Sequence, residues 1–118
     1  MTTREIERSK WNDYMASLTN MCLNRPVTIQ VNSEELGDQV VVERAPFLGM
    51  APELKGSEAC SVDIEVGKAG STDAFMHEVK CADRVMVRED DKGTPLAIDI
   101  EGEDPASHVR IKTILTWV

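Results

Sequence analysis

The residue best suited to chemistry is His77, because an imidazole can exchange a proton near neutral pH. It stands in an alternating segment, on the same face as Phe75 and Val79, so we expect it to point inward. Glu89 could approach His77 in one plausible strand register, but no Ser or Cys is placed to complete a triad. We therefore expect a hydrogen-bonded histidine at the edge of the core. His77 and Glu89 are candidate ligand contacts, and no catalytic residue is predicted.

Thiol chemistry is the second candidate. The chain has three cysteines, without a C-x-x-C motif: Cys22, Cys60 and Cys81. This number and spacing favour neither a disulfide scaffold nor a zinc module, so no metal and no cofactor are predicted. If segments 60–66 and 75–81 form a hairpin whose paired numbers sum to 141, Cys60 lies opposite Cys81. We expect two buried, reduced thiols with Cα atoms about 4.5–5.5 Å apart, and a redox role for them stays open.

The charged clusters are interpreted as solvated surface. One basic face combines His108, Arg110 and Lys112. Two acidic runs, 89–91 and 99–104, lack the alternating ligands and terminal Glu of an EF-hand loop. We expect solvated turns and strand faces at all three places.

Composition narrows the class of protein. The chain has 118 residues, with 21 acidic and 13 basic side chains and a formal net charge of −8. This length is typical of a single domain, residues 1–118. The acidic excess argues against nucleic acid and anionic membrane as partners. The N-terminus lacks the apolar region of a secretory signal, so we expect a cytoplasmic protein.

The elements that position these residues begin with a helix. Apolar side chains recur at helical spacing at Trp11, Tyr14, Met15, Leu18, Met21 and Cys22. This predicts a helix within residues 9–23, capped by the Ser9 hydroxyl and ended by Pro26. Residues 1–8 are expected to be a polar lead-in, with Ile6 as a possible anchor.

From Pro26 onward the hydrophobic period is that of β-strands, which predicts a β-meander over 26–118. Residues 45–59 carry two prolines and two glycines and are expected to form a long crossing loop. Short sequential strands with tight turns favour antiparallel pairing. The predicted fold is α+β: one N-terminal helix packed on a curled antiparallel sheet, or an open barrel, of six to seven strands.

Two further registers follow from the turns. A hairpin closed by residues 90–93, with Gly93 in the left-handed region, would place Val87 opposite Leu96 and Val85 opposite Ile98.

The last strand, 107–118, would pair Val109 with Ile100, so its end would outrun its neighbour. The overhang must then pair with an early strand, pack on the helix or bind another chain. If it does not close, an exposed edge favours a homodimer with Ile114, Leu115 and Trp117 at the interface.

This layout resembles a bacterial family of small domains of unknown function. The resemblance is carried by the helix with Trp11, the strand PVTIQV, the His77-Glu78-Val79 step, Arg84-Val85, the acidic AIDIEGED and the basic-apolar HVRIK. His77 falls on a recurrent histidine of that family. The resemblance implies a bacterial cytosolic domain with no assigned activity.

Three functions are carried forward. The first is a non-catalytic binding or protein-interaction module. The second is a small-ligand or small-substrate protein with a cavity in the curled sheet near His77, for which a pocket of about 300 Å³ or more is expected. The third is a redox role for Cys60 and Cys81.

Overall fold

The computed structural model describes residues 2–53, 60–67 and 74–117. In chain order the elements are β1 (Thr2–Glu5), a 3-10 turn (Arg8–Lys10), α1 (Trp11–Cys22), β2 (Pro26–Ser33), β3 (Gly37–Pro52), β4 (Val62–Val66), β5 (Phe75–Val79), β6 (Ala82–Glu89), β7 (Pro95–Glu103) and β8 (Arg110–Trp117).

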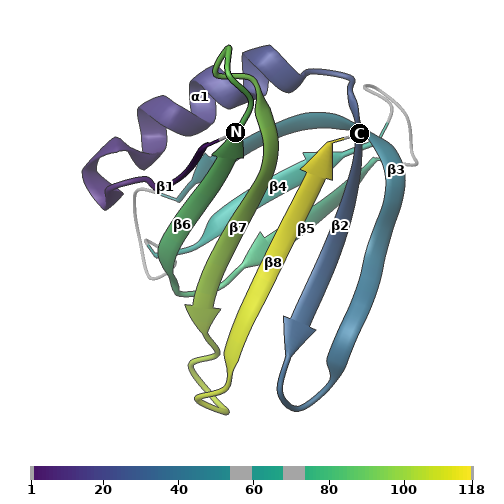
Figure 1. The fold of residues 1–118 in the computed structure, drawn as a ribbon. Helices are drawn as coiled ribbons and strands as arrows, with labels where there is room; N and C mark the ends of the chain where they lie inside the picture. Colours follow the sequence, from purple (N-terminus) through teal and green to yellow (C-terminus); the bar gives the residue numbers. More distant parts are fainter. Residues whose placement is uncertain (1, 54–59, 68–73, 118) are drawn as a thin grey trace.

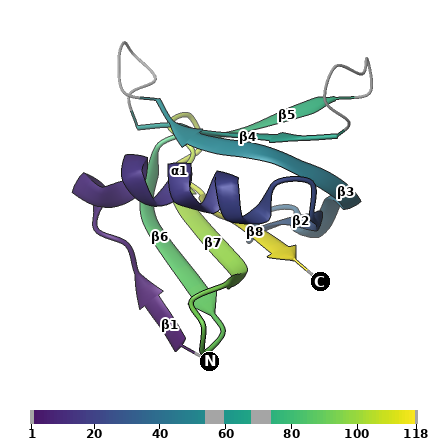
Figure 2. The same cartoon turned by 90° about the horizontal axis from the view of Figure 1, so that it is seen from above.

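The strands form an eight-stranded antiparallel sheet in the order β1-β6-β7-β8-β2-β3-β4-β5. Strand β3 pairs with β2 through its first part and with β4 through its second, so the sheet folds over on itself (Figure 1). Seen from above, α1 crosses the open end, with β4 and β5 on one side and β6 to β8 on the other (Figure 2). The predicted α+β fold is confirmed, but the sheet has eight strands instead of six to seven, and among the described residues it does not close into a barrel.

The core fills the space between the two parts of the folded sheet. Strands β2, β4, β6, β7 and β8 contribute alternate residues to it, and α1 contributes one stripe: Trp11, Met15, Leu18 and Cys22. The indole N–H of Trp11 donates a hydrogen bond to the Ile6 carbonyl at 2.9 Å. The polar group of this buried side chain therefore has a partner.

The N-terminal segment differs from its prediction. Ile6 is buried as expected, but residues 2–5 of the polar lead-in form a strand, β1, which pairs with β6. The proposed Ser9 cap is wrong, because Ser9 lies inside the 3-10 turn that runs directly into α1. The N-cap of α1 is Lys10, which makes no capping hydrogen bond with its side chain.

The loop expected over 45–59 is wrong over its first half. Residues up to Pro52 continue β3, and Phe47 is fully buried. A register shift between Phe47 and Gly49 lets the strand bend while it changes partner from β2 to β4. Residues 54–59 lie outside the described residues.

The first predicted register is confirmed. Every pair of β4 and β5 sums to 141, from Val62–Val79 to Val66–Phe75. Cys60 and Cys81 lie just beyond the paired residues, where the Ala82 N–H donates to the Cys60 carbonyl at 2.8 Å. Both side chains are half-buried rather than buried as expected, and no disulfide joins them; their Cα separation stays a prediction.

The second register is shifted by two residues. Val87 pairs with Ile98 and Val85 pairs with Ile100. A register shift between Arg88 and Glu89, at the end of β6, separates these pairs from the turn. Gly93 has a positive φ of 83° as expected. The Asp90 carboxylate accepts from the Lys92 and Thr94 backbone N–H groups, both at 2.9 Å, which makes the turn longer than predicted.

The third register is shifted by four residues, and this removes the predicted overhang. Ile100 pairs with Thr113, so residues 114–116 pair with β7 on one side and with β2 on the other. Leu115 and Trp117 are buried in the core, and Ile114 lies on the opposite, outer face. A homodimer stays a prediction, but it can no longer rest on a free C-terminal edge.

Candidate functional site

His77 lies on β5, opposite Ile64, and is half-buried. It lines a cavity of about 230 Å³ at one end of the folded sheet, together with Val31, Ile111 and Thr113. This volume is below the 300 Å³ that we set for a small-ligand site. Burial lowers the pKa of His77, so the ring is neutral at neutral pH.

Glu89 serves a different part of the molecule. It lies on β6, which pairs with β1 and β7 and not with β5. The Glu89 carboxylate accepts a hydrogen bond from the Arg4 Nε at 2.9 Å and a second one from the Tyr14 hydroxyl at 3.2 Å. The hydrogen bond from Arg4 lowers the pKa of Glu89 below its usual value. Glu89 therefore ties β1 to α1, and the structure does not bring it to His77.

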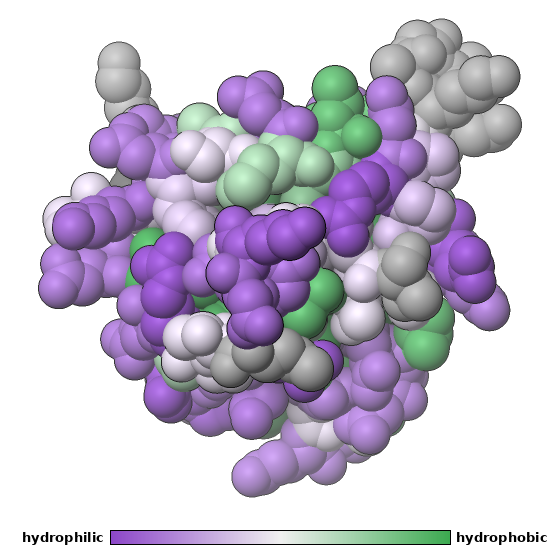
Figure 3. Space-filling view, turned by 45° about the horizontal axis from the view of Figure 1, so that its top comes forward, coloured by the Kyte–Doolittle hydropathy of each residue, from purple (hydrophilic) through white to green (hydrophobic). Residues whose placement is uncertain are grey.

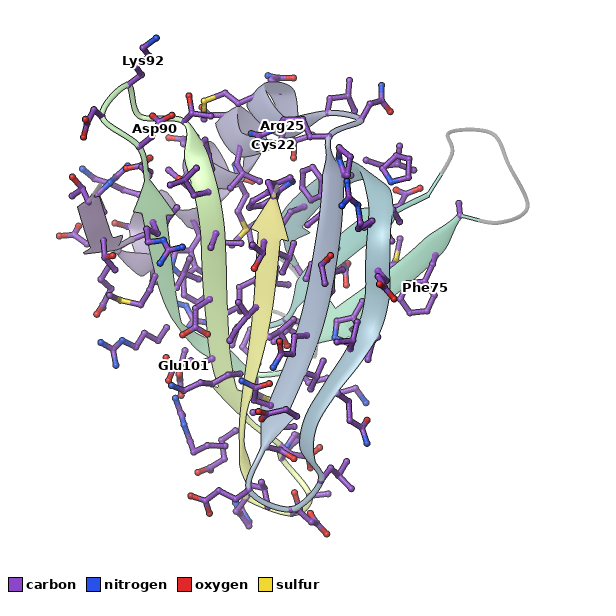
Figure 4. All side chains as sticks on the ribbon, turned by 45° about the vertical axis from the view of Figure 1, so that its right-hand side comes forward. Cys22, Arg25, Phe75, Asp90, Lys92 and Glu101 are labelled. Atoms are coloured by element: carbon purple, nitrogen blue, oxygen red, sulfur yellow. The ribbon has the colours of Figure 1, made fainter. Side chains whose placement is uncertain are left out.

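A larger hollow lies on the outer face of β6, β7 and β8, where the sequence predicted only solvated side chains. We call it the outer-face groove; its volume is about 510 Å³. Asp99 and Glu101 of β7 lie in it, because Ile98 and Ile100 point into the core and the alternate residues must point out. Glu101 points away from β4 and β5 in Figure 4.

The strongest feature of the groove is the environment of Asp99. The register places Met86 on one side of it and Ile114 on the other, so apolar side chains flank the carboxyl group. Its Oδ1 atom is buried and has no hydrogen-bond partner among the described residues. Burial, followed by the negative charge of Glu101 and hydrogen bonding to it, raises the pKa of Asp99 to about 6.

Basic side chains stand at the rim of the groove. The Arg84 Nε lies 3.4 Å from the Glu5 carboxylate, and Arg110 lies 3.6 Å from Glu101. Arg88 and Lys112 are exposed and form no ion pair with any described residue. The groove therefore offers a half-buried acid at its floor and two uncommitted cations at its rim.

This arrangement can hold a ligand but offers little for metal binding. Among residues 2–53, 60–67 and 74–117, no group of three or more His, Cys, Asp or Glu side chains could hold a metal ion. The alternation of AIDIE in the sequence already places Asp99 and Glu101 on one face. The apolar neighbours that isolate Asp99 come from two other strands, which local sequence does not reveal.

No helix in the described part of the chain is both long enough and apolar enough to span a membrane.

The comparisons with known proteins carry no assigned activity. An uncharacterised protein of Aquifex aeolicus (strain VF5) is 34% identical over 55 residues, which are 47% of this chain and 50% of that protein. The chain thus matches about half the length of this relative. The crystal structure of the Bacillus subtilis YojF protein superposes with a TM-score of 0.54 at 11% identity, covering all of this chain and 96% of the other. That likeness concerns the fold alone.

The model of one family matches nearly the whole chain, including β6, β7 and the first half of β8. The match runs over residues 2–113, and the family is described only as one of unknown function. It agrees with the resemblance found in the strand pattern and in the helix that carries Trp11. This chain therefore belongs to DUF5335, a family of unknown function.

Proposed function

We propose that this protein is a non-catalytic binding protein whose ligand occupies the outer-face groove. The observation that carries the proposal is the Asp99 Oδ1 atom, buried and without a hydrogen-bond partner among the described residues. Leaving a buried polar group unsatisfied costs about 1–3 kcal/mol. A ligand that donates a hydrogen bond to Asp99 would recover part of that cost.

The surrounding charges indicate the chemistry of such a ligand. An ammonium or amidinium group would donate a hydrogen bond to Asp99, and its positive charge would offset the negative charges of Asp99 and Glu101. Arg88 and Lys112, on either side, would attract a carboxylate on the same molecule. Met86 and Ile114 supply apolar contact on either side of Asp99. We therefore expect a small zwitterion with an apolar part, such as an amino acid or a dipeptide.

The test is a binding screen by two-dimensional NMR at pH 7.5 with amino acids and dipeptides. We expect a hit to shift the amide signals of β6, β7 and β8, and Asp99→Asn to weaken binding at least about tenfold, which corresponds to about 1.4 kcal/mol. Asp38→Asn, at an exposed position of β3, is the matched control. A hit that binds Asp99→Asn as tightly as wild type would overturn the assignment of the groove.

The 230 Å³ cavity beside His77 is the second candidate site. It is smaller but less open, and a neutral imidazole could accept or donate one hydrogen bond to a small ligand. The same screen separates the two sites. Signals of β5 would shift and His77→Gln would abolish the effect, while Asp99→Asn would leave it unchanged.

A further inference from the structure

The outer edge of β5 is a second surface of interest, on the other side of the molecule from the outer-face groove. Strand β5 ends the strand order, and among the described residues it pairs only with β4. The first two residues of β5 are apolar but exposed: Phe75 has 44% of its surface accessible to solvent, and Met76 has 61%. Figure 4 shows Phe75 projecting from this side of the molecule.

Among the described residues, no β-bulge interrupts this edge. The five pairs of β5 with β4 run without a register shift. By contrast, β3 has two register shifts where it pairs with β2, and Arg44 there has a positive φ of 52°. Bulges of this kind make an edge a poor template for another strand, whereas a regular edge offers its free backbone groups for pairing.

The face beside the β5 edge is acidic and hollowed. Asp63, Glu65 and Glu78 share the outer face of β4 and β5, and none of them forms an ion pair with a described residue. A hollow of about 390 Å³ is lined by Asp63, Glu65 and Met76, and by Thr19 of α1. In the upper part of Figure 3, hydrophobic surface is flanked by hydrophilic side chains.

We propose that the β5 edge binds an extended, basic segment of a partner protein as an additional strand. Backbone hydrogen bonds to the free edge would give affinity, and alternate side chains would give specificity. A Lys or Arg of the partner would lie opposite Glu78, and an apolar side chain would lie against Met76. The neighbouring carboxylates of Asp63 and Glu65 extend the same charge preference across the face.

A second copy of this chain fits the edge less well. Each copy carries a formal net charge of −8. A two-fold pairing of β5 with itself about His77 would place Met76 opposite Glu78 and bring two acidic faces together. No two acidic side chains lie directly opposite each other in that register, but the charge of −8 on each copy opposes association, so charge complementarity favours a basic partner.

The probe is a synthetic peptide of alternating Lys and Val, eight residues long, compared with its Glu-for-Lys counterpart. Titration into labelled protein, followed by NMR, should shift the signals of β5 and slow amide exchange there. Glu78→Lys should weaken binding of the Lys peptide about three- to tenfold, as expected when a cross-strand charge pair is reversed. Glu43→Lys, the same change on exposed β3, should lose much less.

Three outcomes would overturn the proposal. Equal binding of both peptides, or shifts confined to β3 or to the outer-face groove, would exclude the β5 edge as a basic-strand site. Light scattering of the protein alone is the other arm: a dimer that Met76→Lys dissociates would show that the edge serves a second copy instead. Unchanged melting temperatures of the variants would establish that they fold, and binding at this edge is independent of ligand binding at Asp99.

Discussion

Two carboxylates on neighbouring strands of one sheet, Glu89 on β6 and Asp99 on β7, have opposite environments. Glu89 accepts hydrogen bonds from Arg4 and Tyr14, and its pKa is lowered. Asp99 lies between Met86 and Ile114, and its pKa is raised to about 6.

This difference indicates that Glu89 has a structural role and that Asp99 is the better candidate for a functional one. A satisfied carboxylate stabilises the fold that surrounds it. A carboxylate held with an unsatisfied oxygen lowers the stability of the native state, and such groups are concentrated at functional sites. The sequence analysis named Glu89 as a candidate ligand contact. In the structure its carboxylate instead accepts hydrogen bonds that join β1 and α1 to β6.

The largest expected effect is that of Glu89→Ala. Removal of the carboxylate leaves the Tyr14 hydroxyl and the Arg4 guanidinium without their partner, which costs about 1–3 kcal/mol in free energy of unfolding. Because the pKa of Glu89 is lowered in the folded state, its contribution is present above the unfolded value of about 4.5 and fades as the pH falls through the folded value.

Urea denaturation at pH 7 and at pH 3 measures this effect, with Glu43→Ala as the exposed control. A loss at pH 7 no larger than that of the control would mean that Glu89 is not a structural carboxylate, and the contrast with Asp99 would fail.

Asp99→Asn is expected to act in the other direction. The folded-state pKa of about 6 lies above the unfolded value of 3.8, so the native state binds more protons between these values and wild-type stability falls as the pH rises through this window. Removal of the charge should stabilise the protein by about 1 kcal/mol at pH 7.5, after allowance for solvent screening, and by much less at pH 3.5.

Thermal unfolding of both proteins from pH 3.5 to 7.5 tests this prediction. A variant that is less stable than wild type across the whole range would show that the ionised Asp99 is satisfied in solution. Stabilisation together with weaker ligand binding would mark Asp99 as a site that trades stability for function.

Tyr14→Phe gives a smaller effect on the Glu89 side of the comparison. It removes one hydrogen bond and leaves the ion pair with Arg4 in place, so we expect a loss of about 0.5–1.5 kcal/mol. The double variant with Glu89→Ala should lose less than the sum of the two single variants, because both remove the same interaction. Full additivity would show that Tyr14 and Glu89 act independently.

The smallest effect is expected for Ser9→Ala. Loss of a serine that caps a helix costs about 0.5–2 kcal/mol in free energy of unfolding. Because Ser9 lies within the 3-10 turn and Lys10 occupies the N-cap, we now expect a change below about 0.5 kcal/mol. A larger loss in urea denaturation would mean that the helix begins at Ser9 in solution.

The sequence by itself determined which side of α1 and of strands β4, β6 and β7 faces the core. The helical stripe and the alternation around Ile98 and Ile100 follow from local periodicity. Both are buried as expected except at Tyr14, which is half-buried, and Met21, which is 46% exposed. The β4–β5 register was also predictable, because a one-residue slip would turn Asp63 and Glu65 inward.

Tertiary structure decided the registers of β6–β7 and β7–β8. Slips of two and four residues keep every side chain on its own face, so the hydrophobic pattern cannot detect them. Turn geometry fixed them instead, through the Asp90 hydrogen bonds and the longer turn before β8. Those even-numbered slips place Met86 and Ile114 beside Asp99. The candidate site therefore depends on strand registers that local sequence periodicity cannot distinguish.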